Sequence, residues 1–440
     1  MRLSVAAVAL GAACWLGGVP IVRAAETITI DGAVREALAN NPDLLAARHA
    51  IDMARGRLRQ AGLWPNPDLE LEGSDDFLFS REGERGFSSG FAQRFPIARR
   101  LGKAKEVARV DIALAEAELQ DAERNLIGEV GRLIYRLLAL QRKIETQDQV
   151  IGTAEHIAAV AQKRFAVAET SEADVNLLHL EAERLRQERV RLDVERRRAE
   201  STLAELLGRP PDSIVQVKAD LDAAIPLPPR DQVLARALAR RPDVLQRRLE
   251  VERGAAEEKL AKAEKWEDWS VGLFYQRERQ VFEPPGSDAP LGTGRVQSDQ
   301  FAGLRVTVPL PLWNRNQGRI AEARASQSRA KARLTAEELK TKREVETAWF
   351  EVKQLEEVVR SYRERILGLT DRNLDLLHRG YADGLVGISE VLQAQQQYAI
   401  LRQAYYDALG DLWRARIDLE TAGASSPLLP SRPDLFPGAP

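Results

Sequence analysis

The side chains that could do chemistry in this sequence are scattered. The 440-residue chain has four histidines, His49, His156, His179 and His378, and no two of them stand at the spacing of metal ligands. The only methionine after the first residue is Met53, and the only cysteine is Cys14. The sequence contains no phosphate-binding loop, dinucleotide turn or nucleophile–base–acid arrangement. We therefore predict a protein that is not an enzyme and that has no metal site and no cofactor.

Two acidic residues, Asp174 and Glu390, stand at equivalent positions of an internal repeat. Their separation is 390 − 174 = 216 residues, and the pair Phe165 and Tyr381 has the same separation. Each acid is followed by valine. Such acids could line a constriction that attracts cations. They could equally be first-turn acids that the helix dipole favours, and the sequence leaves both interpretations open.

The repeat covers most of the chain and predicts its domains. Residues 37–44 recur as residues 237–244 at an offset of 200, whereas the offset is 216 from Gly318 onward. The second repeat therefore contains 16 additional residues between residue 244 and Gly318. The Pro/Gly-rich stretch 281–297 is the natural place for them, as a longer exterior loop. We predict four segments: a signal peptide at 1–24, a first repeat at 25–227, a second at 228–424 and a proline-rich tail at 425–440. Each repeat is expected to run helix, strand, strand, long helix, tip and helix.

The first 24 residues have the pattern of an export signal. A short basic start precedes an apolar stretch, and small residues, Val22 and Ala24, stand at the two cleavage-site positions, so cleavage is expected near Ala24. Cys14 would leave with this segment unless it is a lipid-attachment site, which stays open. No run of 18 apolar residues follows, so no transmembrane helix is expected. The mature protein is therefore expected in the periplasm, or in the outer membrane as strands.

The elements that must position the two acids are long helices. No proline occurs between Pro96 and Pro210, and none between Pro311 and Pro427. The run 98–164 would be roughly 100 Å long as a helix, and helices at 32–62 and 172–209 could flank it end to end. A capping box is expected at 314–317. Apolar residues alternate spacings of four and three in both blocks: Leu126, Val130, Leu133, Leu137, Leu140, Ile144; and Val345, Ala348, Val352, Leu355, Val359, Tyr362, Ile366, Leu369, Leu376.

The residues between the helices have the pattern of strands. Segments 64–96 and 266–313 contain 13 of the 24 aromatic residues that follow residue 24. Apolar residues alternate in both, as at Phe87, Phe91 and Phe95. This fits strands of an outer-membrane barrel, and a soluble β-hairpin capping a coiled coil is the alternative. Four strands cannot close a barrel, whereas three copies would supply twelve.

The chain resembles the TolC family of outer-membrane efflux channels over nearly its whole mature length. The residues that carry the resemblance are the segments 381–391 (YADGLVGISEV) and 308–318 (VPLPLWNRNQG). The second segment is similar to the heavy-metal branch, the CzcC-like channels. The fold class expected is mainly α with membrane β: a long helical coiled-coil barrel plus four strands of a trimeric twelve-stranded outer-membrane β-barrel.

The resemblance also implies function and partners. It implies a passive exit duct of a tripartite system, a homotrimer working with a periplasmic adaptor (membrane fusion protein) and an inner-membrane RND pump. The cargo would be heavy-metal cations of the Co/Zn/Cd or Cu type, with drugs or other small molecules as the alternative. From another class, a periplasmic coiled-coil or adaptor protein remains open. Outer-membrane lipid would be a further partner, and neither nucleic acid nor a cofactor is implied.

The resemblance assigns roles to two groups of residues. Gly384, Leu385 and Val386 would form the tip that meets the adaptor, with Val167 and Thr170 at the first-half tip. There Val167-Ala168-Glu169-Thr170 departs from the family's frequent valine-glycine. The family's aperture acids correspond to Asp174 and Glu390. A further acid of some members is Leu177 or Gln393 here, so the constriction would be less acidic.

Overall fold

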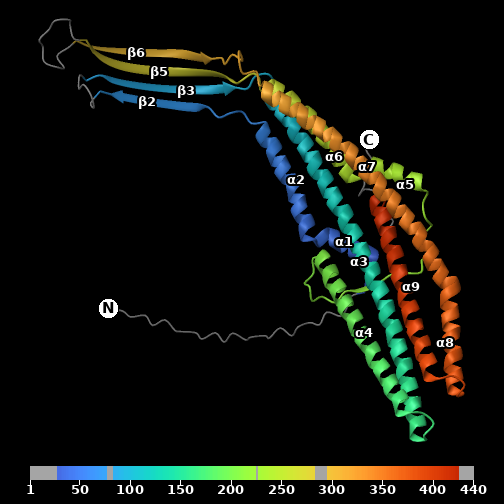
Figure 1. Ribbon diagram of the computed structural model, residues 1–440. Helices are drawn as coiled ribbons and strands as arrows, with labels where there is room; N and C mark the ends of the chain where they lie inside the picture. The colour runs from blue at the N-terminus through green and yellow to red at the C-terminus, as the bar shows by residue number, and fades with distance from the viewer. Residues whose placement is uncertain (1–26, 77–82, 224–225, 283–294, 426–440) are drawn as a thin grey trace, which may run out of the picture.

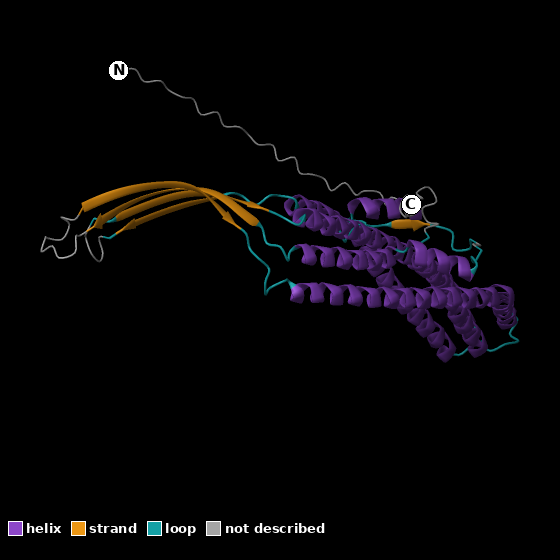
Figure 2. Ribbon diagram, turned by 90° about the horizontal axis from the view of Figure 1, so that it is seen from above, coloured by secondary structure: helices purple, strands orange, loops and turns teal. Residues whose placement is uncertain are grey.

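The computed structural model describes residues 27–76, 83–223, 226–282 and 295–425. The predicted signal peptide at 1–24 with Cys14, residues 283–294 of the predicted exterior loop and residues 426–440 of the predicted tail lie outside the described residues. The molecule is long and narrow, with a curved sheet at one end and helices over the rest (Figure 1). Figure 2 shows the strands leaving the helices together at one end.

Long helices make up most of the fold. Helix α3 has 67 residues, the predicted length displaced by two residues along the chain. None of the helices in the described residues is long and apolar enough to cross a membrane. The helices are α1 Ile30–Asn40, α2 Pro42–Ala61, α3 Arg100–Ala166, α4 Glu172–Leu206, α5 Arg230–Arg240, α6 Pro242–Ala263, α7 Gln317–Ser361, the π-helix η1 Tyr362–Ile366, α8 Leu367–Ala382 and α9 Ile388–Ala422.

Helix α3 lies at the centre of this arrangement. Near the sheet it packs against α2 and α6, and α6 packs against α7. Toward the far tips α4 and α9 take the flanking places, and α9 packs against α7 and α8. The predicted flanking of α3 by shorter helices is therefore confirmed. The predicted helix at 32–62 is wrong in one respect, because Asn41 divides it into α1 and α2 by capping the Leu44 amide at 3.0 Å.

The predicted heptad seam of the first block is buried. Leu126, Val130, Leu137 and Leu140 all belong to the main apolar core. In the middle of this core the Tyr135 ring stacks on Trp413 of α9, with ring centroids 4.2 Å apart. These contacts join the first and second halves of the chain into one core.

The predicted seam of the second block is correct as far as Tyr362, which packs against the main core, and wrong from Leu369 onward. Leu376, predicted to be on the seam, is 66% exposed, and Leu369 is exposed as well. The buried line continues instead one residue later. The cause is η1, a π-helical turn that holds one more residue than an α-turn and so rotates the rest of the helix. The residues that face α9 or the core after this turn are Leu367, Thr370, Leu374, Leu377 and Tyr381.

The predicted capping box at 314–317 is also wrong. Helix α7 begins at Gln317, and Asn316 before it has left-handed backbone with φ 58° and makes no side-chain cap. The side chains of Asn314 and Gln317 accept instead from the amides of Asn316 (3.0 Å) and Arg315 (2.7 Å). These residues therefore fix the loop in front of the helix.

The four strands form one antiparallel sheet in the order β2-β3-β5-β6. They are β2 Asp68–Asp75, β3 Arg85–Phe95, β5 Trp269–Phe282 and β6 Arg295–Thr307. A smaller parallel pair joins β1 Thr27–Thr29 to β4 Gln216–Lys218. This pair could not be predicted from the sequence, because three-residue strands are too short to show a period.

Candidate functional site

The predicted aperture acids lie at the end of the molecule far from the sheet, beside the two helix-to-helix tips. Asp174 is the third residue of α4, and Ser171 at the N-cap accepts from the Asp174 amide at 3.1 Å. The Asp174 carboxylate in turn accepts from the hydroxyls of Ser171 (2.8 Å) and Thr170 (3.1 Å). The Ser171 hydrogen bond, followed by that of Thr170, holds the pKa of Asp174 below its usual range. Asp174 therefore has a capping role that the sequence pattern allowed.

Glu390 occupies the equivalent place in α9 without this role. It is exposed at the third position of the helix, and the N-cap there is Gly387, which has no side chain to cap with. Among the described residues no hydrogen bond or ion pair engages the Glu390 carboxylate. Two acids that look alike in sequence thus differ in surroundings, because one tip supplies hydroxyls and the other supplies glycine.

The predicted adaptor-contact residues form the second tip. Gly384 has φ +72°, a conformation that favours glycine, and the Leu385 amide closes the turn on the Gly380 carbonyl at 2.7 Å. Leu385 is 81% exposed, whereas Val386 packs on Gly380.

In the first tip Ala168 stands where the 216-residue offset places Gly384, and it has left-handed backbone as well, with φ 61°. Val167 beside it is exposed. The departure from valine-glycine therefore preserves the turn and adds strain.

One contact between the two tips had no signal in the sequence. Arg164 of α3 donates to the Tyr381 carbonyl at 3.1 Å, and its guanidinium lies 5.2 Å from the centre of the Tyr381 ring. It joins the ends of α3 and α8. Nothing distinguishes Arg164 among the 64 basic residues until the fold is known.

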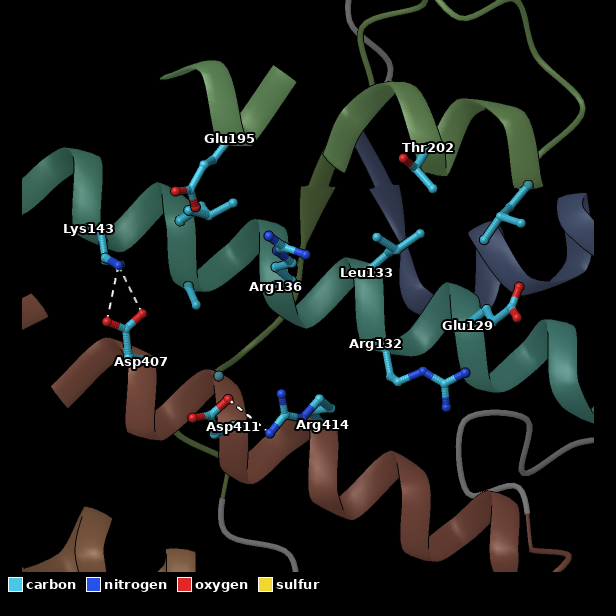
Figure 3. Close-up of a pocket in the computed structure, with 14 residues that line it drawn as sticks. Glu129, Arg132, Leu133, Arg136, Lys143, Glu195, Thr202, Asp407, Asp411 and Arg414 are labelled. Atoms are coloured by element: carbon cyan, nitrogen blue, oxygen red, sulfur yellow. Dashed lines mark hydrogen bonds and ion pairs between the residues drawn. The ribbon is translucent and has the colours of Figure 1, made fainter. Parts of the chain in front are cut away.

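A charged cleft of about 650 Å³ lies along α3 on the sheet side of the tips, between α4 and α9 (Figure 3). Its walls carry both signs of charge, and Lys143 pairs with Asp407 at 2.9 Å. In the described part of the chain no three His, Cys, Asp or Glu side chains are grouped to hold a metal ion. The cleft therefore presents balanced charge to solvent.

The sheet at the other end has two unlike faces. One row of opposed residues on the first face is Leu69, Phe91, Leu273 and Leu304, all of them exposed. Because neighbouring residues of a strand point to opposite faces, the row beginning at Glu70 belongs to the second face. That face carries the acids Asp68, Glu70, Glu72, Glu278 and Asp299 and the bases Arg94 and Arg305.

An exposed apolar sheet face beside a polar one is the pattern of a membrane channel wall, and the long helices extend it away from the membrane. The family model for outer membrane efflux proteins matches residues 33–209 and 233–424. The chain therefore belongs to the outer membrane efflux protein family, and the TolC-family resemblance is confirmed. It is an outer-membrane efflux channel of tripartite systems that reaches into the periplasm, a transport protein and not an enzyme.

The relatives agree with this assignment. The chain is 23% identical to the cobalt-zinc-cadmium resistance protein CzcC of Cupriavidus metallidurans, over 90% of each chain. A crystal structure of CusC superposes with a TM-score of 0.72 at 19% identity, covering 90% of this chain and 92% of that one. The CmeC outer membrane channel of Campylobacter jejuni gives 0.72 at 14% identity, covering 96% and 93%. The family assignment replaces the soluble-hairpin and adaptor alternatives.

Proposed function

We propose that three copies of the chain assemble into one continuous duct. The observation that supports this most is the sheet, in which β2 and β6 each pair on one side only within the described chain. Unpaired edges are not tolerated in a lipid bilayer, and four strands are too few to close a barrel. Three copies supply 3 × 4 = 12 strands.

The helical layer has matching free edges. Leu180 of α4 is exposed at one edge, and Leu369 and Leu376 of α8 are exposed at the other. In a ring of copies, α8 of one copy would lie beside α4 of the next. Burial of these leucines between copies would stabilise the assembly by about 25 cal/mol for each Å² of apolar surface removed from water.

The cargo we propose is heavy-metal cations of the Co/Zn/Cd or Cu type, with drugs as the alternative. The support is the similarity to CzcC over 90% of both chains, together with the 308–318 segment. The excess of acids on the second sheet face, including Glu70 and Glu72, would favour cations in the duct. Asp174 and Glu390 would do so at the periplasmic mouth.

The partners we propose are a periplasmic adaptor and an inner-membrane RND pump. The exposed tip at Gly384, Leu385 and Val386, with Val167 and Thr170 beside it, would meet the adaptor. The chain would reach the outer membrane after removal of residues 1–24.

A deletion strain tests the cargo. We expect loss of the gene to lower tolerance of zinc, cobalt, cadmium or copper, and the wild-type chain to restore it. If tolerance of all four metals is unchanged while drug sensitivity rises, the cargo is drugs and the metal proposal is wrong.

A further inference from the structure

The two unpaired edges of the sheet carry opposite charges on its second face. Arg305 lies on β6, and Glu70 and Glu72 lie on β2, all three with exposed side chains. Within the described residues no hydrogen bond or ion pair engages any of the three, and the Arg305 guanidinium lies 5.1 Å from the centre of the Phe274 ring. One edge therefore presents a base without an acid, and the other edge presents acids without a base.

The pairing within one copy explains why these charges have no partner there. Gly272 lies directly opposite Arg305, and Ser88 lies directly opposite Glu72. The diagonal positions hold no opposite charge either. Opposite charges stabilise a sheet when they face each other across neighbouring strands. The neighbour that Arg305 lacks therefore belongs on the open side of β6, where the described chain supplies no strand.

The internal repeat extends into the strands with two offsets. Trp64 and Trp266, which precede β2 and β5, are 202 residues apart. Pro96 and Pro311, each the last proline before a long helix, are 215 residues apart. The first offset therefore relates β2 to β5, and the second relates β3 to β6.

The registers of the two hairpins confirm these offsets. Leu69 of β2 lies opposite Phe91 of β3. Adding 202 to the first residue and 215 to the second gives Val271 and Val306, which lie opposite each other in the second hairpin. The two hairpins are therefore equivalent residue by residue.

The same offsets predict how one copy meets the next. Within one chain the first repeat joins the second where β3 pairs with β5, and Gly90 lies opposite Phe274 there. Between copies the second repeat joins the first repeat of the next copy, so β6 would pair with β2. Residue 90 plus 215 is Arg305, and residue 274 minus 202 is Glu72. The repeat thus places Arg305 directly opposite Glu72 of the next copy.

We propose that Arg305 of one copy forms an ion pair with Glu72 of the next copy in the wall of the duct. The inference rests on the three-copy duct proposed above and names the contact that joins its copies. The same offsets place Glu70 of the next copy opposite Thr307, which carries no charge. Arg305 therefore offsets the charge of Glu72, and Glu70 contributes more than Glu72 to the cation preference of the barrel.

Disulfide cross-linking of the protein extracted from outer membranes tests the register. Cys14, the only cysteine, lies in the predicted signal peptide, so introduced cysteines have no competitor after its removal. Phe91 lies opposite Leu273 within one chain, so the offsets place Val306 opposite Leu71 of the next copy. Oxidation of Val306→Cys/Leu71→Cys should therefore link the copies covalently.

Two slipped pairs are the matched controls. Val306→Cys/Leu69→Cys and Val306→Cys/Gly73→Cys move the register by two residues in either direction and keep every side chain on its face. We expect the predicted pair to link at least about fivefold more than either control, because a disulfide needs close β-carbons. Better linking of a slipped pair would overturn the inference. So would the absence of links in all three variants of a trimeric protein.

The wild-type protein separates this outcome from failure of the duct itself. If the wild-type chain is a single copy in the same detergent, the three-copy duct is wrong. If it is a trimer and only the register differs, the duct stands and the inference falls.

Charge changes test the ion pair. Arg305→Glu would place like charges opposite each other, so the trimer should separate at a lower temperature, and Arg305→Glu/Glu72→Arg should restore it. In planar bilayers Glu70→Gln should lower the cation-to-anion permeability ratio at least about twofold more than Glu72→Gln, its neighbour on the same strand and face. An unchanged separation temperature in Arg305→Glu, no recovery in the double variant, or equal effects of the two acids would contradict the pair.

Discussion

Asp174 and Glu390 occupy equivalent positions of the two repeats but differ in their hydrogen bonds. The hydroxyls of Ser171 and Thr170 donate to the Asp174 carboxylate, so Asp174 stabilises the start of α4. Glu390 has no such engagement among the described residues. The repeat could be found from sequence, but this difference could not, because it depends on which tip residues surround each acid.

The first prediction separates the two acids. Glu390→Gln should reduce the cation preference of the channel, because its charge faces solvent, and should cost less stability than Asp174→Asn, because no side-chain hydrogen bond to Glu390 is lost. Asp174→Asn should cost roughly 0.5–1 kcal/mol of stability through the weakened interaction at the helix N-terminus. Thermal unfolding and reversal potentials in planar bilayers measure both. An unchanged cation preference in the double variant would show that these acids do not line the mouth.

A second residue-scale effect comes from Glu420 of α9. Burial raises the pKa of Glu420 to about 8 from its usual 4.5, and the guanidinium groups of Arg416 and Arg236 offset this only in part. The folded state therefore binds a proton that the unfolded chain releases between pH 4.5 and 8. Linkage then makes this contribution to stability greatest below pH 4.5 and lost as pH rises through 8.

The second prediction concerns this fall of folding stability with rising pH. Glu420→Gln keeps the side chain neutral, so its stability should fall less than that of wild type as pH rises from 5 to 9, by roughly 1–4 kcal/mol. Chemical unfolding at a series of pH values measures the difference. Parallel stability curves for the two proteins would contradict the raised pKa.

At the scale of elements, the π-turn η1 explains why the predicted seam fails at Leu369 and Leu376. The spacing of apolar residues predicted the seam correctly to Tyr362, because regular α-helix preserves a heptad. A π-turn adds one residue without changing the residue types, so the spacing continued through Leu369 and Leu376 while the helix had already rotated. The predicted capping box also fails, because Asn316 has left-handed backbone and its side chain does not cap α7.

The third prediction uses that extra residue. Deletion of Glu364 within η1 should convert it to α-helix and still leave Leu377 and Tyr381 facing inward, so the fold should survive. Deletion of Asn373 should instead rotate the end of α8 by about 100° and expose both. Hydrogen exchange across α8 and the second tip measures the outcome. Equal disruption by the two deletions would contradict the assignment of the π-turn.

The fourth prediction concerns the two faces of the sheet. Leu273 lies in the exposed apolar row, and Gln276 of the same strand lies on the other face. Leu273→Arg should destabilise the membrane-inserted protein by roughly 2–4 kcal/mol, whereas Gln276→Arg should be nearly neutral. Unfolding from lipid vesicles measures both. The faces would be reversed if Gln276→Arg proved the more damaging change.

At the scale of the whole molecule, the internal repeat and the distribution of prolines predicted most of the architecture. Long helices and paired strands each leave a period in the sequence, so both could be placed from residue types alone. The relation between them could not, since the packing of α9 between α3 and α8 and the register of the four strands are contacts between distant residues. The same limit applies to assembly, because the two free sheet edges become visible only in the folded chain.

The mass of the protein extracted from outer membranes in mild detergent is the most direct test of the three-copy duct. We expect a particle of three copies in the outer-membrane fraction, which separates into single chains when heated in denaturant. A single copy recovered from the soluble periplasm would contradict it, since one chain would then keep both sheet edges unpaired in water.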